Sequence, residues 1–214
     1  APELGNARPF EAGICANLKP APRMMKAAIG KQARPANSAW LRTLRKYRAE
    51  WNAEVAAIAG DRSAPIHPAA FFAELKAALP ANVLYAWDGG DFIHWGRATL
   101  PAERAGAWLR LGPLGTIGSA LPNSIALQRE FPDEPVVMIT GDGSLGFYLA
   151  ELDTLVRHGL LVVVIVGNDA GWGLELELQG ELCGTTAACE LSPARYDLIM
   201  RGFGGKGENI ETLA

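Results

Sequence analysis

The sequence predicts an α/β fold in which helices cover both faces of a mainly parallel sheet, a three-layer αβα sandwich. Two observations lead to this class. After residue 62, short apolar runs bounded by glycine and aspartate alternate with helical stretches, and such alternation is typical of a parallel sheet covered on both sides. The run LLVVVIV at 160–166 has no period of two, which predicts a central strand with both faces buried.

Two shorter segments precede this domain. Residues 1–33 contain a strand-like stretch at 12–17 and a helix from about Pro22, and we expect them to be the tail of a preceding domain. Residues 34–62 are expected to be a linker helix, because apolar side chains recur at three- and four-residue intervals between Ala39 and Ala59. This apolar stripe, which is expected to be buried, consists of Trp40, Leu44, Tyr47, Trp51, Val55 and Ile58.

Residues 63–214 are expected to form the main domain. Pro68 suits the first turn of a helix that runs to Leu79. Strands are predicted at 83–87, 136–140 and 161–166, and helices at 116–129, 145–158 and 194–202. The chain begins without methionine and stops at Ala214 in what resembles an opening helical turn. We therefore expect a fragment that is truncated at its C-terminus.

Composition and charge exclude several classes of protein. Hydrophobic residues make up 49% of the 214 positions, enough for a sizeable core. The net charge is −3 and no long basic run occurs, so nucleic acid is not an expected partner. The longest apolar run is far shorter than the roughly 20 residues of a membrane span. Cys15, Cys183 and Cys189 lack CxxC spacing, which favours a reducing cytoplasm over a disulfide framework or a zinc site.

The segment 136–173 carries the most chemical information, because it is predicted to be a single βαβ unit. Asp142 follows its first strand and Asn168 its second, and such crossovers often join neighbouring strands, so both side chains are expected at one sheet edge. Carboxylate and amide oxygens are ligands that Mg²⁺ or Ca²⁺ accepts. The N–H groups of Gly143 and Ser144, at the start of a helix, can receive an anion. This combination predicts a metal that bridges the protein to a phosphate.

Three other interpretations stay open at this point. Asp-Gly-Ser between a strand and a helix is also common turn and N-cap chemistry with no ligand. A second possibility is a non-catalytic module that binds a metal phosphate and serves assembly only. The third, an ordinary doubly wound nucleotide-binding domain, is disfavoured because the chain has neither GxGxxG after a strand nor a P-loop lysine.

Several stretches of the chain together resemble one enzyme family. GDGS at 141–144, followed later by Gly167 and Asn168, is similar to the GDG…NN signature of thiamine-diphosphate enzymes. LGPLGTIGSALPNSIAL at 111–127 and RYDLIMRGFGGKGENIETLA at 195–214 resemble the acetolactate synthase and 2-hydroxyacyl-CoA lyase branch. The resemblance covers residue 63 to the end, and residues 1–33 resemble the last strand and helix of the family's middle domain. It implies the thiamine diphosphate-binding fold, with thiamine diphosphate and Mg²⁺ as cofactors.

The resemblance also implies roles for individual residues. Mg²⁺ would be bound by Asp142, the Asn168 side chain and the main-chain carbonyl of Ala170. Two catalytic positions are implied: Ile117 would wedge under the thiazolium ring and bend the cofactor, and Gly115 would offer its carbonyl to the aminopyrimidine. The residues implied to bind the cofactor are Gly89, Gly90, Asp91, Gly115, Ile117, Gly141, Asp142, Gly143, Ser144, Asn168, Ala170, Gly171 and Trp172.

Two places depart from the family pattern. Synthases commonly have a glutamine and a histidine where this chain has Asp91 and Phe92. An acid beside a diphosphate is unfavourable unless it faces elsewhere or pairs with Arg97. The first Asn of the usual pair is Gly167, which leaves the implied metal ligand Asn168 in place.

The implied reaction makes or breaks a carbon–carbon bond of a 2-keto acid or a 2-hydroxyacyl-CoA. Acetolactate synthase-like activity is the first expectation, and 2-hydroxyacyl-CoA lyase or 2-keto acid decarboxylase activity is the alternative. In this family a glutamate that protonates the pyrimidine comes from a separate N-terminal pyrimidine-binding domain, usually of a partner subunit. We therefore expect the isolated chain to be inactive and the complete protein to be a homodimer or homotetramer. A flavin, where present, would sit mostly in the middle domain.

The remaining polar candidates are weaker. His67 and His158 are expected at helix ends in structural roles, and His94 is expected to be packed or solvated. Glu175 and Glu177 follow the implied metal loop, where they either line the substrate side or form the wet face of an amphipathic helix.

Overall fold

The computed structural model describes residues 13–30 and 38–213. Contacts divide the chain into two units, Ala1–Trp51 and Asn52–Ala214. Helix α1 (Ala21–Ile29) belongs to the first unit, and helix α2 (Ala39–Ala59) begins in the first and ends in the second. Within the described ranges, no helix is long and apolar enough to cross a membrane.

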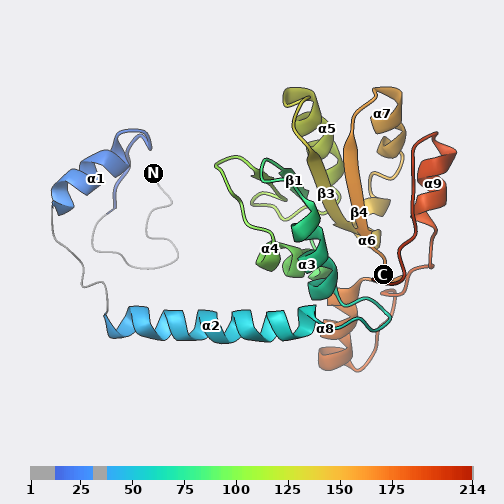
Figure 1. The fold of residues 1–214 in the computed structure, drawn as a ribbon, viewed down its shortest axis with the longest axis horizontal. Helices are drawn as coiled ribbons and strands as arrows, with labels where there is room; N and C mark the ends of the chain where they lie inside the picture. Colours follow the sequence, from blue (N-terminus) through green and yellow to red (C-terminus); the bar gives the residue numbers. More distant parts are fainter. Residues whose placement is uncertain (1–12, 31–37, 214) are drawn as a thin grey trace. The chain divides into compact units, whose positions relative to one another are not determined.

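A parallel sheet forms the centre of the second unit (Figure 1). Its described strands are β1 (Leu84–Trp87), β2 (Trp108–Leu109), β3 (Val136–Gly141) and β4 (Val162–Gly167). They lie in the order β2-β1-β3-β4, and all three pairings are parallel. The carboxyl ends of β1, β3 and β4 therefore meet at one edge of the sheet.

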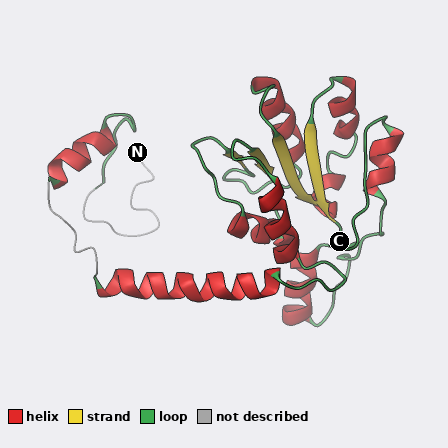
Figure 2. Ribbon diagram, viewed as in Figure 1, coloured by secondary structure: helices red, strands yellow, loops and turns green. Residues whose placement is uncertain are grey.

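Helices cover both faces of this sheet, as the sequence predicts (Figure 2). The covering helices are α3 (Pro68–Ala78), α4 (Asp91–Thr99), α5 (Ala120–Glu130), α7 (Glu151–Arg157) and α9 (Tyr196–Gly202). Alternate strand residues enter two separate cores. Leu84 and Ala86 pack with α5, α7 and α9, whereas Tyr85 and Trp87 pack with α3 and α4. The expected three-layer αβα sandwich is confirmed.

Gly96 allows α4 to lie close against the sheet. A Cβ at this position would come within 2.7 Å of the Phe72 ring and 2.8 Å of the Trp87 ring, and both rings are fully buried. Each such apolar side chain stabilises the fold by about 1.5–3 kcal/mol. Since α4 begins directly after the turn that follows β1, this packing fixes the turn at the carboxyl edge.

Strand β4 differs from the prediction for its sequence. It lies at the edge of the described sheet rather than in its centre, and its burial is incomplete, with Val163 56% exposed. The prediction of a central strand with both faces buried is therefore wrong for the described sheet. An unbroken apolar run does not show whether a strand has a hydrogen-bonded neighbour on each side, or whether every side chain in it is covered.

Several other segments of the structure differ from their predictions. Residues 13–17 form no strand, since no neighbouring strand pairs with them among the described residues. The single helix expected at 145–158 is divided into α6 (Asp142–Gly146) and α7. The α2 helix matches its predicted range, but its apolar stripe is not buried, with Trp40 68% and Tyr47 62% exposed. Periodicity identified that helix without showing what covers it.

Candidate functional site

The register of β3 and β4 brings two polar residues to the same place. Gly141, the last residue of β3, pairs with Gly167, the last residue of β4. Asp142 and Asn168 are the next residues along the chain. Their adjacency at the carboxyl edge follows from a short crossover between neighbouring strands, as the sequence predicts.

Asp142 presents a buried carboxylate with one oxygen unused. The residue is 3% exposed. Its Oδ1 accepts a hydrogen bond from the Gly143 N–H at 2.8 Å, whereas its Oδ2 is buried without a partner. Burial raises the pKa of Asp142, and the nearby Asp169 raises it further, although the N–H groups of Gly143 and Gly171 act in the opposite direction. An unpartnered buried charge is costly, so this oxygen is suited to a cation.

Asp142 Oδ2 differs from the other buried polar atoms without a partner because it belongs to a carboxylate. Among the described residues, the other buried side-chain polar atoms without a partner belong to neutral groups: Trp87 Nε1, Trp108 Nε1, Ser119 Oγ and Gln128 Oε1. A divalent cation satisfies a carboxylate oxygen directly. Histidine, cysteine and acidic residues of the described chain form no group of three or more able to hold a metal. A metal here would therefore depend on amide and main-chain oxygens as well.

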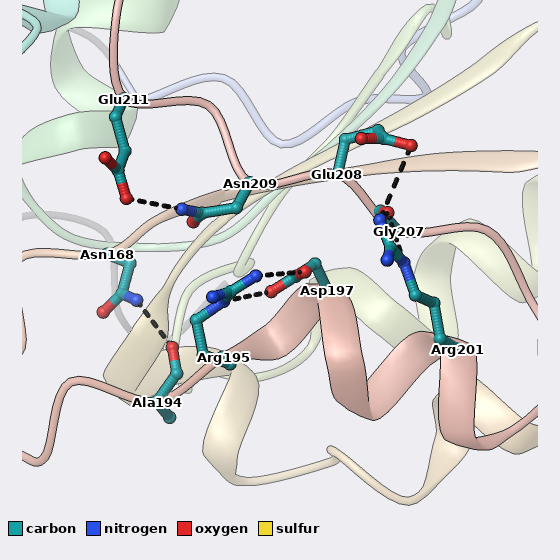
Figure 3. Close-up of polar contacts among 9 residues, drawn as sticks. All are labelled: Asn168, Ala194, Arg195, Asp197, Arg201, Gly207, Glu208, Asn209 and Glu211. Carbon is teal, nitrogen blue, oxygen red and sulfur yellow. Dashed lines mark hydrogen bonds and ion pairs between the residues drawn. The ribbon is translucent and has the colours of Figure 1, made fainter.

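The Asn168 side chain can supply one of these oxygens. Its Nδ2 donates to the Ala194 carbonyl at 2.9 Å, as Figure 3 shows. The next residue, Arg195, binds both carboxylate oxygens of Asp197 at 2.7 and 2.8 Å, and this hydrogen bonding is the main reason why the pKa of Asp197 is lowered. With its nitrogen engaged by the Ala194 carbonyl, the Asn168 amide keeps Oδ1 as its remaining polar atom.

The segment after Asn168 is held in an irregular conformation. Ala170 has a positive φ of 56°, and its carbonyl accepts from the Leu191 N–H at 2.7 Å, leaving one lone pair for another partner. Trp172 donates its N–H to the Cys189 carbonyl at 2.8 Å. Its ring lies over Gly143, where a Cβ would approach within 2.7 Å. Trp172 therefore covers the turn that carries Asp142.

The helix after β3 is short. Helix α6 begins at Asp142 itself, so Gly143 and Ser144 lie in its first turn. Both are buried, and the Gly143 N–H already donates to Asp142 Oδ1. The sequence predicted N–H groups at a helix start in this place, but expected the helix to begin three residues later and to run on through 158.

A buried carboxylate that sequence reasoning missed lies at the end of β1. Asp88 is 1% exposed, and its Oδ1 accepts from the N–H groups of Gly89 at 3.0 Å and Gly118 at 2.8 Å. Its Oδ2 accepts from Thr140 Oγ1 at 3.3 Å. The available signal was an acidic residue directly after a buried apolar run, the same signal that identified Asp142.

The glycine-rich loop at 111–118 meets the turn after β1. A Cβ at Gly89 would lie 3.0 Å from Ile117 Cγ2, so these two predicted positions are in contact. Ile117 is half-buried, and Gly115 is exposed with a positive φ of 65°. The structure thus brings Gly89 and Ile117 together, whereas Gly115 lies further out on the loop surface.

The two departures from the family pattern occupy one space. A Cβ at Gly167 would come within 2.5 Å of the Phe92 ring, so the ring fills the room that a larger residue at 167 would need. Gly90, with a positive φ of 106°, caps α4, and Asp91 is exposed in the first turn. No ion pair joins Asp91 to Arg97 in the described structure.

The weaker candidates have ordinary structural surroundings. His67 caps α3, where its Nδ1 accepts from the Ala69 N–H at 3.1 Å, and His158 caps the C-terminus of α7, so both predicted helix-end roles are confirmed. His94 is exposed on α4. Helix α8 (Gly173–Cys183), which carries Glu175 and Glu177, has no buried residue.

Fold and candidate site together are those of the class of α/β domains whose ligands bind beyond the carboxyl ends of parallel strands. Comparison with known proteins narrows this class. Residues 88–214 match the family model "Thiamine pyrophosphate enzyme, C-terminal TPP binding domain". The chain belongs to this family; thiamine pyrophosphate is another name for thiamine diphosphate.

Curated relatives agree with this assignment. The acetolactate synthase large subunit of Mycobacterium tuberculosis is 39% identical over 162 residues, covering 75% of this chain and 29% of that protein. The 2-hydroxyacyl-CoA lyase 2 of Caenorhabditis elegans is 36% identical over 148 residues, covering 68% of this chain and 23% of that protein. The chain thus spans less than a third of these relatives.

The fold is shared with a solved enzyme structure. The thiamine diphosphate-dependent 4-hydroxybenzoylformate decarboxylase of Rhodococcus jostii RHA1 superposes with a TM-score of 0.66 at 22% identity, over 71% of this chain and 29% of that chain. At this identity the likeness shows the fold alone.

Proposed function

We propose that this chain supplies the diphosphate- and Mg²⁺-binding half of an acetolactate synthase-like active site. The observation that carries the proposal is the unpartnered, buried Oδ2 of Asp142 beside Asn168. A buried carboxylate oxygen without a donor is suited to a divalent cation. Family membership supports thiamine diphosphate as the group that this cation would hold.

The proposed metal ligands are Asp142, the Asn168 side chain and the Ala170 carbonyl. The Asn168 amide supports this role because its nitrogen is engaged by Ala194 and its oxygen is not. The Gly143 N–H would face a diphosphate oxygen once Asp142 Oδ1 releases it. The N–H groups of Ser144 and Gly171 would do so as well, the latter on leaving Asp169 Oδ1. Diphosphate oxygens and water would complete the octahedral coordination of Mg²⁺.

The remaining proposed cofactor contacts come from the turn after β1, the glycine-rich loop at 111–118, the end of β3 and the segment after β4. Bound thiamine diphosphate would supply the chemistry that makes or breaks a carbon–carbon bond beside a carbonyl. Ile117, half-buried against Gly89, would support the thiazolium ring, and Gly115 would offer its carbonyl to the pyrimidine. Asp91, exposed on α4, would face away from the diphosphate. The other proposed cofactor contacts are Gly90, Gly141 and Trp172.

The proposed substrate is a 2-keto acid, because the relatives include proteins named acetolactate synthase. A 2-hydroxyacyl-CoA is the second candidate, since further relatives are named 2-hydroxyacyl-CoA lyase 2. Lyase or decarboxylase chemistry would use the same half-site.

The complete site would need other parts of a longer protein. We propose that residues 63–214 are the cofactor-binding domain, residues 34–62 a linker helix and residues 1–33 the tail of a middle domain. A pyrimidine-binding domain, supplied within a homodimer or homotetramer, would complete the site. The isolated chain would then lack turnover. Unpaired cysteines support a cytoplasmic location.

Calorimetric titration of the chain with thiamine diphosphate, with and without Mg²⁺, tests the proposal. We expect Mg²⁺-dependent binding that disappears in Asp142→Ala. Asp153→Ala is the matched control, because Asp153 is an exposed carboxylate of α7 paired with Arg157, and it should bind as the wild type does. Binding that ignores Mg²⁺ or survives Asp142→Ala would contradict the proposed site.

An activity assay distinguishes a catalytic domain from a module that serves assembly only. With the pyrimidine-binding domain added, turnover of pyruvate would support the synthase-like function. Cofactor binding without turnover of keto acid or hydroxyacyl-CoA would instead favour a non-catalytic module.

A further inference from the structure

Asp88 connects three segments that are distant in the sequence. Its carboxylate binds the Gly89 N–H in the turn after β1, the Gly118 N–H in the glycine-rich loop and the Thr140 hydroxyl near the end of β3. Asp88 is 1% exposed and Thr140 is fully buried. Shielded from water, these hydrogen bonds to a charged acceptor are stronger than neutral ones. One side chain therefore fastens the glycine-rich loop to two neighbouring strands.

Gly118 is enclosed by another segment as well. Its φ of +86° suits glycine, and a Cβ there would lie 2.8 Å from Phe147 Cβ and 2.8 Å from the Tyr148 ring. Phe147 and Tyr148 directly follow α6. The main chain at 118 is thus set between the Asp88 carboxylate and the segment that continues from the proposed metal turn.

Asp88 Oδ1 binds the main chain on both sides of the contact between Ile117 and Gly89. The side chain of Ile117 rests on Gly89, with Cγ2 3.0 Å from the place of a Cβ. Asp88 Oδ1 accepts from Gly89, on which Ile117 rests, and from Gly118, the residue that follows Ile117. Loss of this oxygen would free both main-chain segments, and the position of Ile117 would no longer be defined.

We propose that Asp88 is a positioning residue that acts through the N–H groups of Gly89 and Gly118 to hold Ile117 where it supports the thiazolium ring. The inference rests on the proposed function, because it takes Ile117 as the support of the cofactor. Because it is 1% exposed, Asp88 would not touch the cofactor itself. Its effect comes from geometry, since displacement of a positioning group by about 1 Å can cost about a hundredfold in activity.

The test compares three variants of the chain by two measurements. Asp88→Ala removes both acceptors, whereas Asp88→Asn keeps an oxygen for the two N–H groups and turns an amide toward the Thr140 hydroxyl. Ser124→Ala is the matched control, because Ser124 is equally buried but its hydroxyl donates to the Leu121 carbonyl within α5 and to Met138 Sδ, and not to the loop at 111–118. If Asp88→Ala does not fold, Asp88→Ser replaces it, since its shorter side chain withdraws the acceptor from Gly118.

The first measurement is amide hydrogen exchange of the ligand-free chain at residues 111–118. The second is calorimetric affinity for thiamine diphosphate with Mg²⁺. We expect Asp88→Ala to exchange faster in this loop and to bind the cofactor about tenfold or more weakly, about 1.4 kcal/mol. Asp88→Asn should restore both properties, and Ser124→Ala should lower the melting temperature without changing either.

The outcomes are distinguishable. Faster exchange with unchanged affinity would show a purely structural Asp88 and overturn the inference, while the proposed function would stand. Unchanged exchange in Asp88→Ala would overturn it as well. Wild-type chain that binds no cofactor, even with the pyrimidine-binding domain supplied, would overturn the proposed function and this inference with it.

Discussion

Asp88 and Asp142 occupy equivalent places, but both carboxylate oxygens of Asp88 accept hydrogen bonds, whereas only one oxygen of Asp142 does. Asp88 follows the last residue of β1 and Asp142 follows the last residue of β3, and both are nearly inaccessible, at 1% and 3% exposed. Asp88 accepts from two N–H groups and a hydroxyl. Asp142 has one oxygen engaged by the Gly143 N–H and the other without a partner.

This difference would separate a structural carboxylate from the proposed metal ligand. Burial raises the pKa of both residues. N–H groups oppose this rise in pKa at both residues, but the Thr140 hydroxyl also opposes it at Asp88, whereas Asp169 adds like charge beside Asp142. A buried carboxylate whose oxygens are all engaged holds segments together, and one with a free oxygen is suited to a cation.

Asp142→Asn is expected to give the largest effect. Loss of an anionic ligand should weaken Mg²⁺-dependent binding of thiamine diphosphate by about a hundredfold or more. The unfolding free energy of the ligand-free chain should stay constant or rise, because an uncompensated buried charge is removed. Asp88→Ala should lower it by about 1–3 kcal/mol, because Gly118 and Thr140 lose their acceptor.

Calorimetry and urea unfolding with a chelator present measure these two quantities. Equal losses of stability in Asp142→Asn and Asp88→Ala would remove the distinction between the two carboxylates. A stable Asp142→Asn that retains Mg²⁺-dependent binding would show that the open oxygen is not a metal ligand.

The paired glycines at the ends of β3 and β4 allow a second test of how crowded this edge is. Gly167→Ala should destabilise the chain by about 1–3 kcal/mol through overpacking, because its Cβ would lie 2.5 Å from the Phe92 ring. Gly141→Ala is the control, since its nearest neighbour would be the Gly167 carbonyl at 4.0 Å. Denaturant unfolding measures both.

Combining Gly167→Ala with Phe92→Ala completes a double-mutant cycle. The double variant should lose less stability than the two single variants together, with a coupling of about 0.5–3 kcal/mol. Additive losses would show that Phe92 and Gly167 are independent, and that the residues beside Asp142 tolerate a larger side chain.

The smallest expected effect is the pH dependence that arises from Asp88. Burial raises its folded-state pKa above the ordinary value of 3.8, so the folded chain holds this proton more tightly than the unfolded chain. The resulting stabilisation is complete below pH 3.8 and is lost as the pH rises through the folded-state pKa. The melting temperature of wild type relative to Asp88→Asn should therefore fall as the pH is raised toward neutrality. A relative increase over this range would be the wrong sign.

Local patterns were sufficient to predict much of the fold and part of the site. Alternation of apolar runs and helices predicted β1, β3 and β4, and the crossover rule placed Asp142 beside Asn168. The sequence did not predict the role of Asp88, because an aspartate before two glycines is common in turns. Its decisive partners, Gly118 and Thr140, lie 30 and 52 residues further along the chain.

The sequence by itself determined the order of the elements, the three-layer class and the resemblance to thiamine-diphosphate enzymes, because these depend on local periodicity and on short motifs. Only the tertiary structure decided which buried carboxylate is saturated, that β4 lies at the edge of the described sheet, and that Phe92 fills the space beside Gly167. The physical reason is that hydrogen-bond saturation and steric fit depend on distant backbone and side-chain groups, whose positions no local pattern records.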